Sequence, residues 1–281
     1  MRSFIENRPF LIIILLFFGA QGLMAQGDCS ALPERSNERL ACEYGRKAIT
    51  FKQGSKQSQI LFDSAIALNP KYAWAYYEKS VPFFKRGLLS EGIQLLNKAV
   101  DLDPLSYLTY RAYWFYQHKS FAYCRNDLEA FYAMEGSYPE NTPGGAMDMR
   151  LILAITYVQL GANEKGIELI NETINSYPSE DYLGPYDYHA LGAAYFKNGQ
   201  YAEARAVLLE SIKRNEQFAD SYYYLAAAAE QLGDLKDAKY YINESVLRYN
   251  GEKNGYSGYP LCFPIAKQMA VDKMKALEAL K

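Results

Sequence analysis

Histidine and cysteine are scarce in this sequence of 281 residues, which contains only His118, His189 and four cysteines. No Cys-x-x-Cys pair is present and neither histidine lies near a cysteine, so the ligand spacing of a zinc site is missing. The sequence also lacks a glycine-rich phosphate loop, a metalloprotease helix motif and a calcium loop. The stretch Gly255-Tyr256-Ser257-Gly258-Tyr259 lacks the last glycine of a hydrolase elbow, and we interpret it as a turn. We therefore expect no metal, no cofactor and no catalytic activity.

An excess of positive charge is missing as well, because 30 Lys and Arg residues stand against 32 Asp and Glu residues. A formal net charge of −2 gives the chain no cationic field for phosphate groups, so we expect no nucleic-acid partner. No stretch shows a sustained period-two alternation of apolar and polar residues, which predicts an almost wholly helical chain. Apolar residues make up 49% of the sequence, enough for an ordinary hydrophobic core.

A long apolar run occurs at the start of the chain. Arg2 and Arg8 precede the run 10–18, and the small-residue stretch 19–25 follows it, which is the layout of a secretory signal. The run is shorter than the roughly 20 residues that cross a bilayer, so a retained anchor is the less favoured alternative. We predict a signal peptide over 1–25 that is cleaved after Ala25, with no integral membrane segment left after cleavage. The mature protein should then be exported, either to the periplasm or to the medium.

Four cysteines remain after this cleavage, an even number that permits disulfides in an exported chain. Four cysteines allow three pairings, and four small buried thiols are the alternative. Only Cys29 and Cys42 are near neighbours in the sequence. We predict that these two form a disulfide and that Cys124 and Cys262 stay reduced.

Four glycines mark an internal repeat, since the same classes of residue recur at fixed distances from each of them. The glycines are Gly87, Gly161, Gly199 and Gly233. Five residues after them stand the small residues Gly92, Gly166, Ala204 and Ala238, and nine residues after them stand the large apolar residues Leu96, Ile170, Leu208 and Ile242. Small residues let two helices approach and glycine suits the tight turn between them, so the pattern indicates helix-turn-helix units.

The stretch 191–195 followed by 199–204 resembles the tetratricopeptide repeat family, and Gly199 and Gly233 have its spacing of 34 residues. The resemblance implies an all-α fold, a right-handed α-solenoid of about six helix-turn-helix tetratricopeptide repeats with a C-terminal capping helix. The 74 residues between Gly87 and Gly161 leave room for one degenerate repeat. In it, Trp114 falls where the family has a small residue and Phe121 where it has the turn glycine. We assign 26–37 to an N-terminal segment, 38–250 to the repeats, and 251–281 to a loop and the capping helix.

The resemblance also implies that the first helix of each repeat lines a concave groove, where a partner protein or peptide binds. The residues that we expect to contact it are Trp74, Tyr77, Phe84, Arg111, Phe115, His118, Tyr186, His189 and Tyr223. The alternative is a groove that the chain fills itself, either by tight coiling or with the capping helix. The expected function is that of an adaptor, scaffold or assembly factor. A structural subunit of a cell-envelope complex is the second hypothesis, and an enzyme with an unrecognised site is the third.

Overall fold

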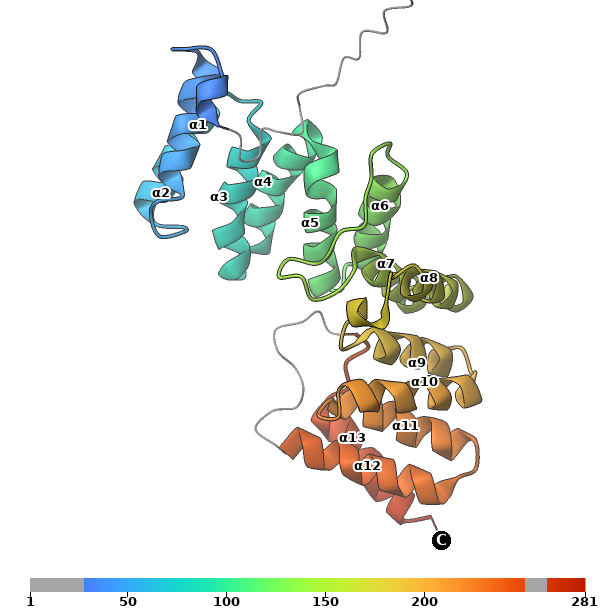
Figure 1. The fold of residues 1–281 in the computed structure, drawn as a ribbon. Coiled ribbons are helices and arrows are strands. Elements are labelled where there is room, and N and C mark those ends of the chain that lie inside the picture. The colour runs from blue at the N-terminus through green and yellow to red at the C-terminus, as the bar shows by residue number, and fades with distance from the viewer. Residues whose placement is uncertain (1–27, 251–261, 281) are drawn as a thin grey trace, which may run out of the picture. The chain divides into compact units, whose positions relative to one another are not determined.

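The computed structural model describes residues 28–250 and 262–280, and in these ranges the chain is helical without a β strand (Figure 1). Thirteen α helices and two short 3₁₀ helices form, which confirms the expected all-α repeat array with a C-terminal helix behind it. The bounds are η1 Cys29–Ala31, α1 Asn37–Ala48, α2 Lys56–Leu68, α3 Ala73–Lys85, α4 Leu89–Leu102, α5 Pro104–Gln117, α6 Phe121–Tyr132, α7 Met149–Gln159, α8 Asn163–Asn175, η2 Glu180–Tyr182, α9 Asp187–Lys197, α10 Tyr201–Arg214, α11 Ala219–Gln231, α12 Leu235–Asn250 and α13 Lys267–Glu278. The proposed signal peptide, 1–25, and the predicted glycine-rich loop, 251–260, lie outside the described residues.

The chain divides into two compact units, residues 1–82 and 83–281, with α3 crossing the boundary. The described part of the first unit packs α1 and α2 around a small core that contains Phe62 and Trp74. A disulfide joins Cys29 to Cys42 and so ties η1 to α1. No described helix is long and apolar enough to span a bilayer.

The second unit stacks its helices in consecutive pairs. The helices α5 and α6, α7 and α8, α9 and α10, and α11 and α12 pack on one another, and each pair packs on the next. Each first helix also contacts the first helix of the following pair, α5 with α7, α7 with α9 and α9 with α11. These helices surround one large hydrophobic core, in which α7 is buried along nearly its whole length.

In four of the helix pairs the turn is closed by the same backbone hydrogen bond, as the turn at Gly199 illustrates. Gly199 has φ +79°, and the Gln200 backbone N–H donates to the Tyr195 carbonyl oxygen at 3.0 Å. A positive φ is unfavourable for residues with a Cβ, which explains why glycine recurs at this position. The same closing bond links Leu88 to Phe83, Ala162 to Tyr157 and Asp234 to Ala229, each at 2.9 Å.

The third repeat makes this turn without glycine. Lys119 takes the left-handed conformation with φ 58°, and the Ser120 N–H donates to the Phe115 carbonyl oxygen at 2.8 Å. Lys119 also stands two residues before its second helix, as each turn glycine does. The placement of the turn at Phe121 was therefore wrong by two residues.

This register corrects part of the account of the third repeat as degenerate. Counted from Lys119, the position that we assigned to Trp114 belongs to Ala112, which is fully buried. Cys124 takes the small position of the second helix and Leu128 the large apolar one, and both are fully buried. The repeat still departs from the others, because it lacks the turn glycine and has the large residue Phe131 twelve residues after the turn, where they have a small one.

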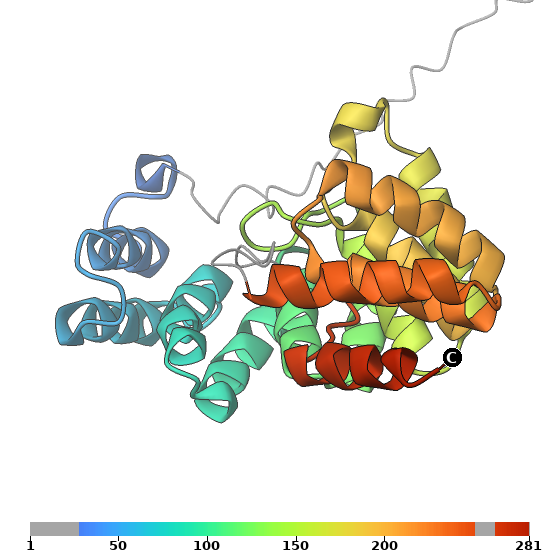
Figure 2. The same cartoon turned by 90° about the horizontal axis from the view of Figure 1, so that it is seen from below.

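The last helix, α13, covers the end of the second unit, where it packs on α12 (Figure 2). Ala270 and Leu277 of α13 are buried in one cluster with Ala238 and Ile242 of α12. Lys273 of α13 pairs with Glu230 of α11. An apolar edge of the last repeat is thereby covered, as the end of a solenoid requires.

Candidate functional site

Residues 262–266, which directly precede α13, form no helix and lie against helices of the second unit. We call them the 262–266 segment. Cys262 is 1% exposed and Phe263 is 2% exposed, so this non-helical stretch is buried as deeply as the core. Buried backbone groups need hydrogen-bond partners, and the side chains of α9, α11 and α12 supply them.

His189 of α9 binds the first of these backbone groups. Its Nε2 lies 2.9 Å from the Cys262 carbonyl oxygen, and its Nδ1 lies 3.0 Å from the Ser221 hydroxyl. A carbonyl oxygen only accepts, so Nε2 carries the proton and donates, while Nδ1 of the neutral ring accepts from Ser221. Complete burial lowers the pKa of His189 to about 4, which keeps the imidazole neutral near pH 7.

Three further side chains bind the next residues of the segment. The Tyr224 hydroxyl of α11 donates to the Phe263 carbonyl oxygen at 3.2 Å. The Ile265 backbone N–H donates to the Asp220 carboxylate at 3.3 Å. The Tyr249 hydroxyl of α12 donates to the Ile265 carbonyl oxygen at 2.8 Å and also contacts Asp220. We name the set His189, Asp220, Tyr224 and Tyr249 the segment site, because all four recognise backbone atoms.

The side chains of the segment pack into the core of the second unit. The Phe263 ring joins the main hydrophobic cluster, with the Lys197 ammonium 5.4 Å from its centroid. The Cys262 sulfur lies 3.8 Å from the Met147 sulfur. Burying a phenylalanine ring contributes about 2 kcal/mol from apolar area. Apolar burial and backbone hydrogen bonds thus hold the 262–266 segment against the helices of the second unit.

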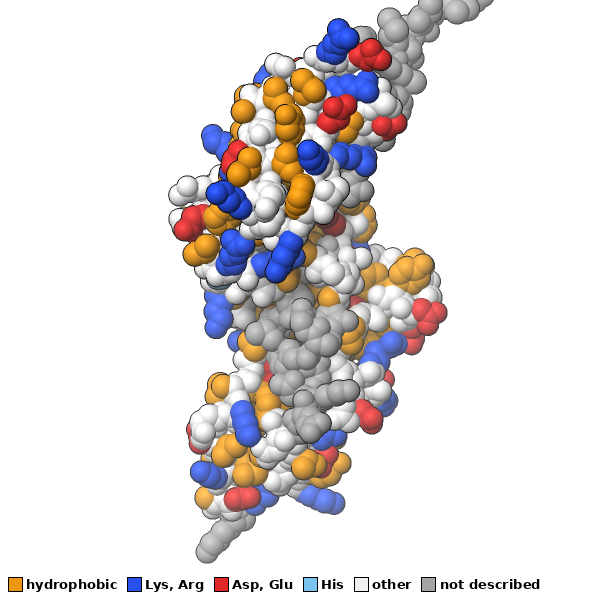
Figure 3. Space-filling model, turned by 90° about the vertical axis from the view of Figure 1, so that its left-hand side faces the viewer, with side chains coloured by type: hydrophobic (Ala, Val, Ile, Leu, Met, Phe, Trp, Pro, Cys, Tyr) orange, Lys and Arg blue, Asp and Glu red, His pale blue; other side chains and the backbone are white. Residues whose placement is uncertain are grey.

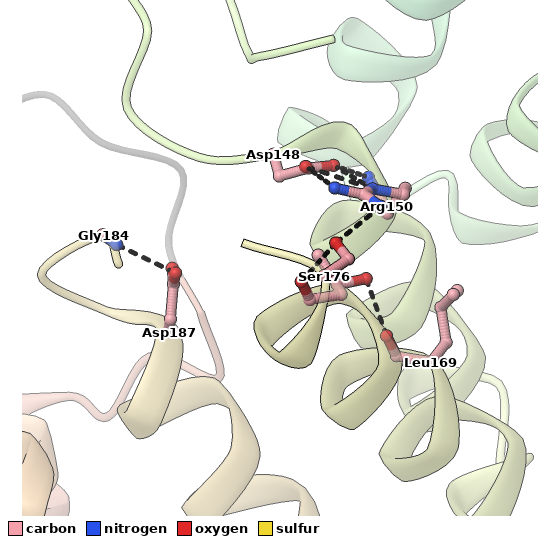
Figure 4. Close-up of polar contacts among 7 residues, drawn as sticks. Asp148, Arg150, Leu169, Ser176, Gly184 and Asp187 are labelled. Carbon is pink, nitrogen blue, oxygen red and sulfur yellow. Dashed lines mark hydrogen bonds and ion pairs between the residues drawn. The ribbon is translucent and has the colours of Figure 1, made fainter. Parts of the chain in front are cut away.

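Figure 4 shows two groups of polar contacts, one at the first turn of α9 and one between the start of α7 and the end of α8. The Asp187 carboxylate accepts from the Gly184 N–H at 2.9 Å, and its burial raises its pKa to about 6. Asp148 accepts from Arg150, which also donates to the Ser176 hydroxyl at 3.0 Å. These bonds connect α7 to the end of α8 and fix the loop before α9. Among the described residues, no group of His, Cys, Asp and Glu could hold a metal ion.

Four of the nine residues predicted to line an open groove are buried, three of them in the core and His189 beneath the 262–266 segment, so none of the four lines an open groove. Trp74 packs edge-on against Phe62 in the first unit. Phe84 stacks on Trp114 with ring centroids 4.5 Å apart. Large aromatics at these positions fill the space beside small residues of the neighbouring helix. The four are Trp74, Phe84, Tyr186 and His189.

The other five predicted residues are partly or largely exposed. Arg111 forms a bidentate pair with Asp127, with both N–O distances 2.8 Å, and donates to Asn97, so its charge is matched inside its own repeat. Phe115 packs on Tyr123 of α6 at 5.2 Å between centroids. His118 is exposed at the end of α5. The remaining two are Tyr77 in the first unit and Tyr223 on α11, both half-buried.

Sequence reasoning missed most of the segment site. It selected His189 but not Asp220, Tyr224 or Tyr249, and it selected Tyr223, which neighbours Tyr224. One signal was available: Asp187 and Asp220 both occupy the first turn of a helix whose remaining residues are mainly apolar. A carboxylate among apolar residues indicates a polar partner, although the sequence does not show that the partner of Asp220 is the C-terminal segment.

Comparison with known families identifies the repeat. Residues 189–251 match the tetratricopeptide repeat family, a range that contains most of α9 and all of α10 to α12. No curated protein matches the chain in sequence.

Solved structures with the same fold share little sequence identity with this chain. The APC/C hetero-tetramer Cut9–Hcn1 is 15% identical with a TM-score of 0.58 over 90% of this chain, which spans 45% of that chain. PilF of Pseudomonas aeruginosa is 16% identical with a TM-score of 0.56, covering 78% of this chain and 96% of PilF. YrrB, a TPR protein with an unusual peptide-binding site, is 14% identical with a TM-score of 0.52, covering 69% of this chain and 95% of YrrB. These similarities show the fold, a solenoid of tetratricopeptide repeats.

Proposed function

We propose that this protein is an exported, non-catalytic adaptor that binds a non-helical segment of a partner protein on the first helices of its repeats. One observation carries the proposal: His189, Asp220 and Tyr224 of α9 and α11 already bind a non-helical stretch of this chain through its backbone. Side chains that bind backbone groups accept many sequences, as a peptide-binding surface requires. The peptide-binding site of YrrB, a protein of the same fold, supports this function.

Export is supported by the N-terminal sequence and by the cysteines. The disulfide between Cys29 and Cys42 is of the kind that forms and persists in oxidising compartments. Cell fractionation followed by peptide mapping without reduction tests this part of the proposal. We expect the mature chain outside the cytoplasm with Cys29 and Cys42 joined, and a cytoplasmic, reduced chain would contradict export.

A second function, as a structural subunit of a cell-envelope complex, is favoured by an observation on the first unit. Large apolar side chains of α1, α2 and the turn between them are exposed to 37–53%, and Figure 3 shows apolar side chains gathered on this part of the molecule with basic side chains around them. They are Leu40, Tyr44, Ile49, Phe51 and Ile60. Exposed apolar patches of this kind mark interaction surfaces in soluble proteins.

Site-specific photo-crosslinking in the native cell separates the two functions. A photoreactive amino acid replaces Tyr223 on α11, Ile60 on α2, or Tyr240 on α12 as an exposed control. The adaptor proposal predicts crosslinks from position 223 to one defined segment of a partner protein. Crosslinks from position 60 alone would favour the structural subunit, and equal labelling at all three positions would contradict both.

A further inference from the structure

We infer that the 262–266 segment is a ligand in cis, which occupies the segment site and leaves it when a partner segment of the same chemistry binds. This inference rests on the proposed function and states which peptide the site accepts. The segment joins the last helix to the repeats, so its departure exposes binding groups that are buried in the present structure.

The hydrogen bonds of the segment site are independent of the segment's side chains. Three carbonyl oxygens, of Cys262, Phe263 and Ile265, and the Ile265 N–H are bound by side chains of the repeats. Any chain with the same backbone course could make these four bonds. The site therefore binds a peptide backbone in the way that a peptide receptor does.

The side chains define the chemistry of the partner. Cys262 and Phe263 are almost fully buried, Pro264 is exposed and Ile265 is half-buried. A buried charge without a partner is strongly unfavourable, so the first two positions accept a small uncharged residue followed by an aromatic one. The third position tolerates proline and the fourth prefers an aliphatic residue. We therefore expect an uncharged, non-helical segment of the type small-aromatic-Pro-aliphatic.

The segment is also a strained ligand for its own site. Phe263 has φ 46°, a left-handed conformation that disfavours residues with a Cβ. A partner that binds the same site with a less strained backbone at this position competes effectively. The strain gives a physical reason for exchange.

Most residues of the core of the second unit come from the helix pairs themselves. Leu191 of α9, Leu208 of α10, Leu225 of α11 and Ile242 of α12 are buried within the helix pairs themselves. By contrast, Cys124 lies inside the array, where its thiol bonds to Thr156 of the next helix at 3.4 Å. Exposure of Cys124 requires the repeats to separate, whereas exposure of Cys262 requires only that the segment leave.

These two cysteines provide the test, because the other two form a disulfide. The full-length mature protein is treated with N-ethylmaleimide, and mass spectrometry follows the modification of each thiol with time. We expect Cys262 to react at least tenfold faster than Cys124 while the circular dichroism spectrum stays unchanged. Burial raises the pKa of both thiols, so neither reacts in the closed form.

A synthetic peptide then tests whether the site exchanges ligands. The peptide has the sequence of residues 262–268 with serine in place of cysteine, and the control peptide has alanine in place of phenylalanine. A peptide that binds only the open form increases the open population in proportion to its concentration above its dissociation constant. We expect the first peptide to accelerate modification of Cys262 and leave Cys124 unchanged, and we expect no effect of the control peptide.

A matched pair of variants tests the site itself. Tyr224→Phe removes the hydrogen bond to the Phe263 carbonyl oxygen and retains the ring, so Cys262 should react several-fold faster. Tyr223→Phe on the same helix is the control and should not change the rate.

The inference is overturned if Cys262 and Cys124 react at the same rate, or if Cys262 reacts rapidly but does not respond to the peptide. Neither result affects crosslinking of a partner from position 223, so failure of the inference is distinguishable from failure of the proposed function. Rapid, peptide-sensitive modification of Cys262 without any crosslinked partner would contradict the proposed function and leave the inference intact.

Discussion

The third repeat, α5 with α6, and the fifth repeat, α9 with α10, pack their two helices alike. They differ in which part of the chain contacts the buried side chain of the first helix ten residues before the turn. Ten residues before the turn, the third repeat has Thr109 and the fifth has His189, and both side chains are buried. Thr109 hydrogen-bonds Glu140, which belongs to the loop that directly follows α6. His189 instead binds the carbonyl of Cys262, 73 residues further along the chain.

This comparison shows which contacts are equivalent in the two repeats and which are not. The contact between the two helices uses equivalent residues in both repeats, such as Leu128 and Leu208, so packing follows the repeat. The buried position ten residues before the turn has no equivalent partner in the two repeats, so a different segment of the chain can bind there in each repeat. In the third repeat the contacting segment is the next loop, which is local in sequence. In the fifth repeat it is the 262–266 segment, which can exchange with a partner segment.

The largest expected effect tests whether the two repeats do share one register. Leu128→Ala and Leu208→Ala each remove a fully buried leucine at the equivalent position, and each should lower the free energy of unfolding by about 2–5 kcal/mol. Chemical denaturation of both variants measures the two losses. An exposed alanine two residues beyond Leu128, Ala130, is the control, and Ala130→Gly should cost only about 1 kcal/mol. A small effect of Leu128→Ala would refute the register set by Lys119.

The second effect concerns pH and distinguishes the fifth repeat through Asp187 and His189. The folded-state pKa of His189, about 4, lies below the unfolded value of 6.5, so stability from this group is lost as pH falls from 6.5 towards 4. The folded-state pKa of Asp187, about 6, lies above the unfolded value of 3.8, because burial and the nearby Asp148 outweigh Gly184 and Arg214. Stability from Asp187 therefore rises as pH falls from 6 towards 3.8. Each change amounts to about 3 kcal/mol, and the two oppose each other.

Single substitutions expose these opposing contributions. In His189→Gln only Asp187 of the two groups still titrates, so the free energy of unfolding should rise as the pH falls from 6 to 4. In Asp187→Asn only His189 of the two groups still titrates, so the free energy of unfolding should fall as the pH falls from 6 to 4. The slope against pH, measured by urea unfolding, is the observable, since both substitutions also change stability at every pH. Equal slopes for the two variants would contradict the assignment.

A smaller effect tests how closely the helices of the fifth repeat approach. A Cβ added to Gly192 would lie 2.5 Å from Leu208 Cγ, whereas the third repeat already has Ala112 at the equivalent position. Gly192→Ala should therefore cost about 1–3 kcal/mol through overpacking, despite the better helix propensity of alanine. Thermal unfolding measures the loss. Leu208→Val in the same chain should recover part of it, and a strictly additive double variant would show that the two residues do not meet.

The sequence predicted the repeats well because their packing residues recur at fixed spacing. The glycines at 87, 161, 199 and 233 and the small residues after them located four of the six helix pairs, and the C-terminal helix followed from its apolar residues. The register of the third repeat was missed because Lys119 adopts a conformation that its residue type does not announce. Backbone conformational preference is a probability, so one turn residue other than glycine was enough to shift the predicted register by two residues.

The candidate site was harder to predict for a different physical reason. Trp74 and Phe84 were selected as groove residues because aromatics favour interfaces, but the same aromatic surface favours burial beside Gly45 and Gly92. The partners of Asp220 and Tyr249 lie 45 and 16 residues away, at Ile265, which has no periodic relation to the repeats. Contacts of this kind depend on where the chain returns, which the spacing within a repeat does not encode.

The smallest expected effect concerns the turn residue that distinguishes the two repeats. Lys119 has φ 58°, which costs a residue with a Cβ about 1–2 kcal/mol in the folded state, and glycine avoids this cost. Glycine also gives the unfolded chain more conformational freedom, which opposes the gain by about 0.4–1 kcal/mol. The folded-state term is the larger, so Lys119→Gly should raise the free energy of unfolding by less than about 1 kcal/mol. Lys213→Gly, at an exposed position in the last turn of α10, lacks the folded-state gain and should be destabilising by up to about 1 kcal/mol. Urea unfolding of the two variants beside the parent measures the signs, which should be opposite. Two losses of similar size would show that Lys119 is not strained and that glycine recurs at the other turns for a reason other than its left-handed conformation.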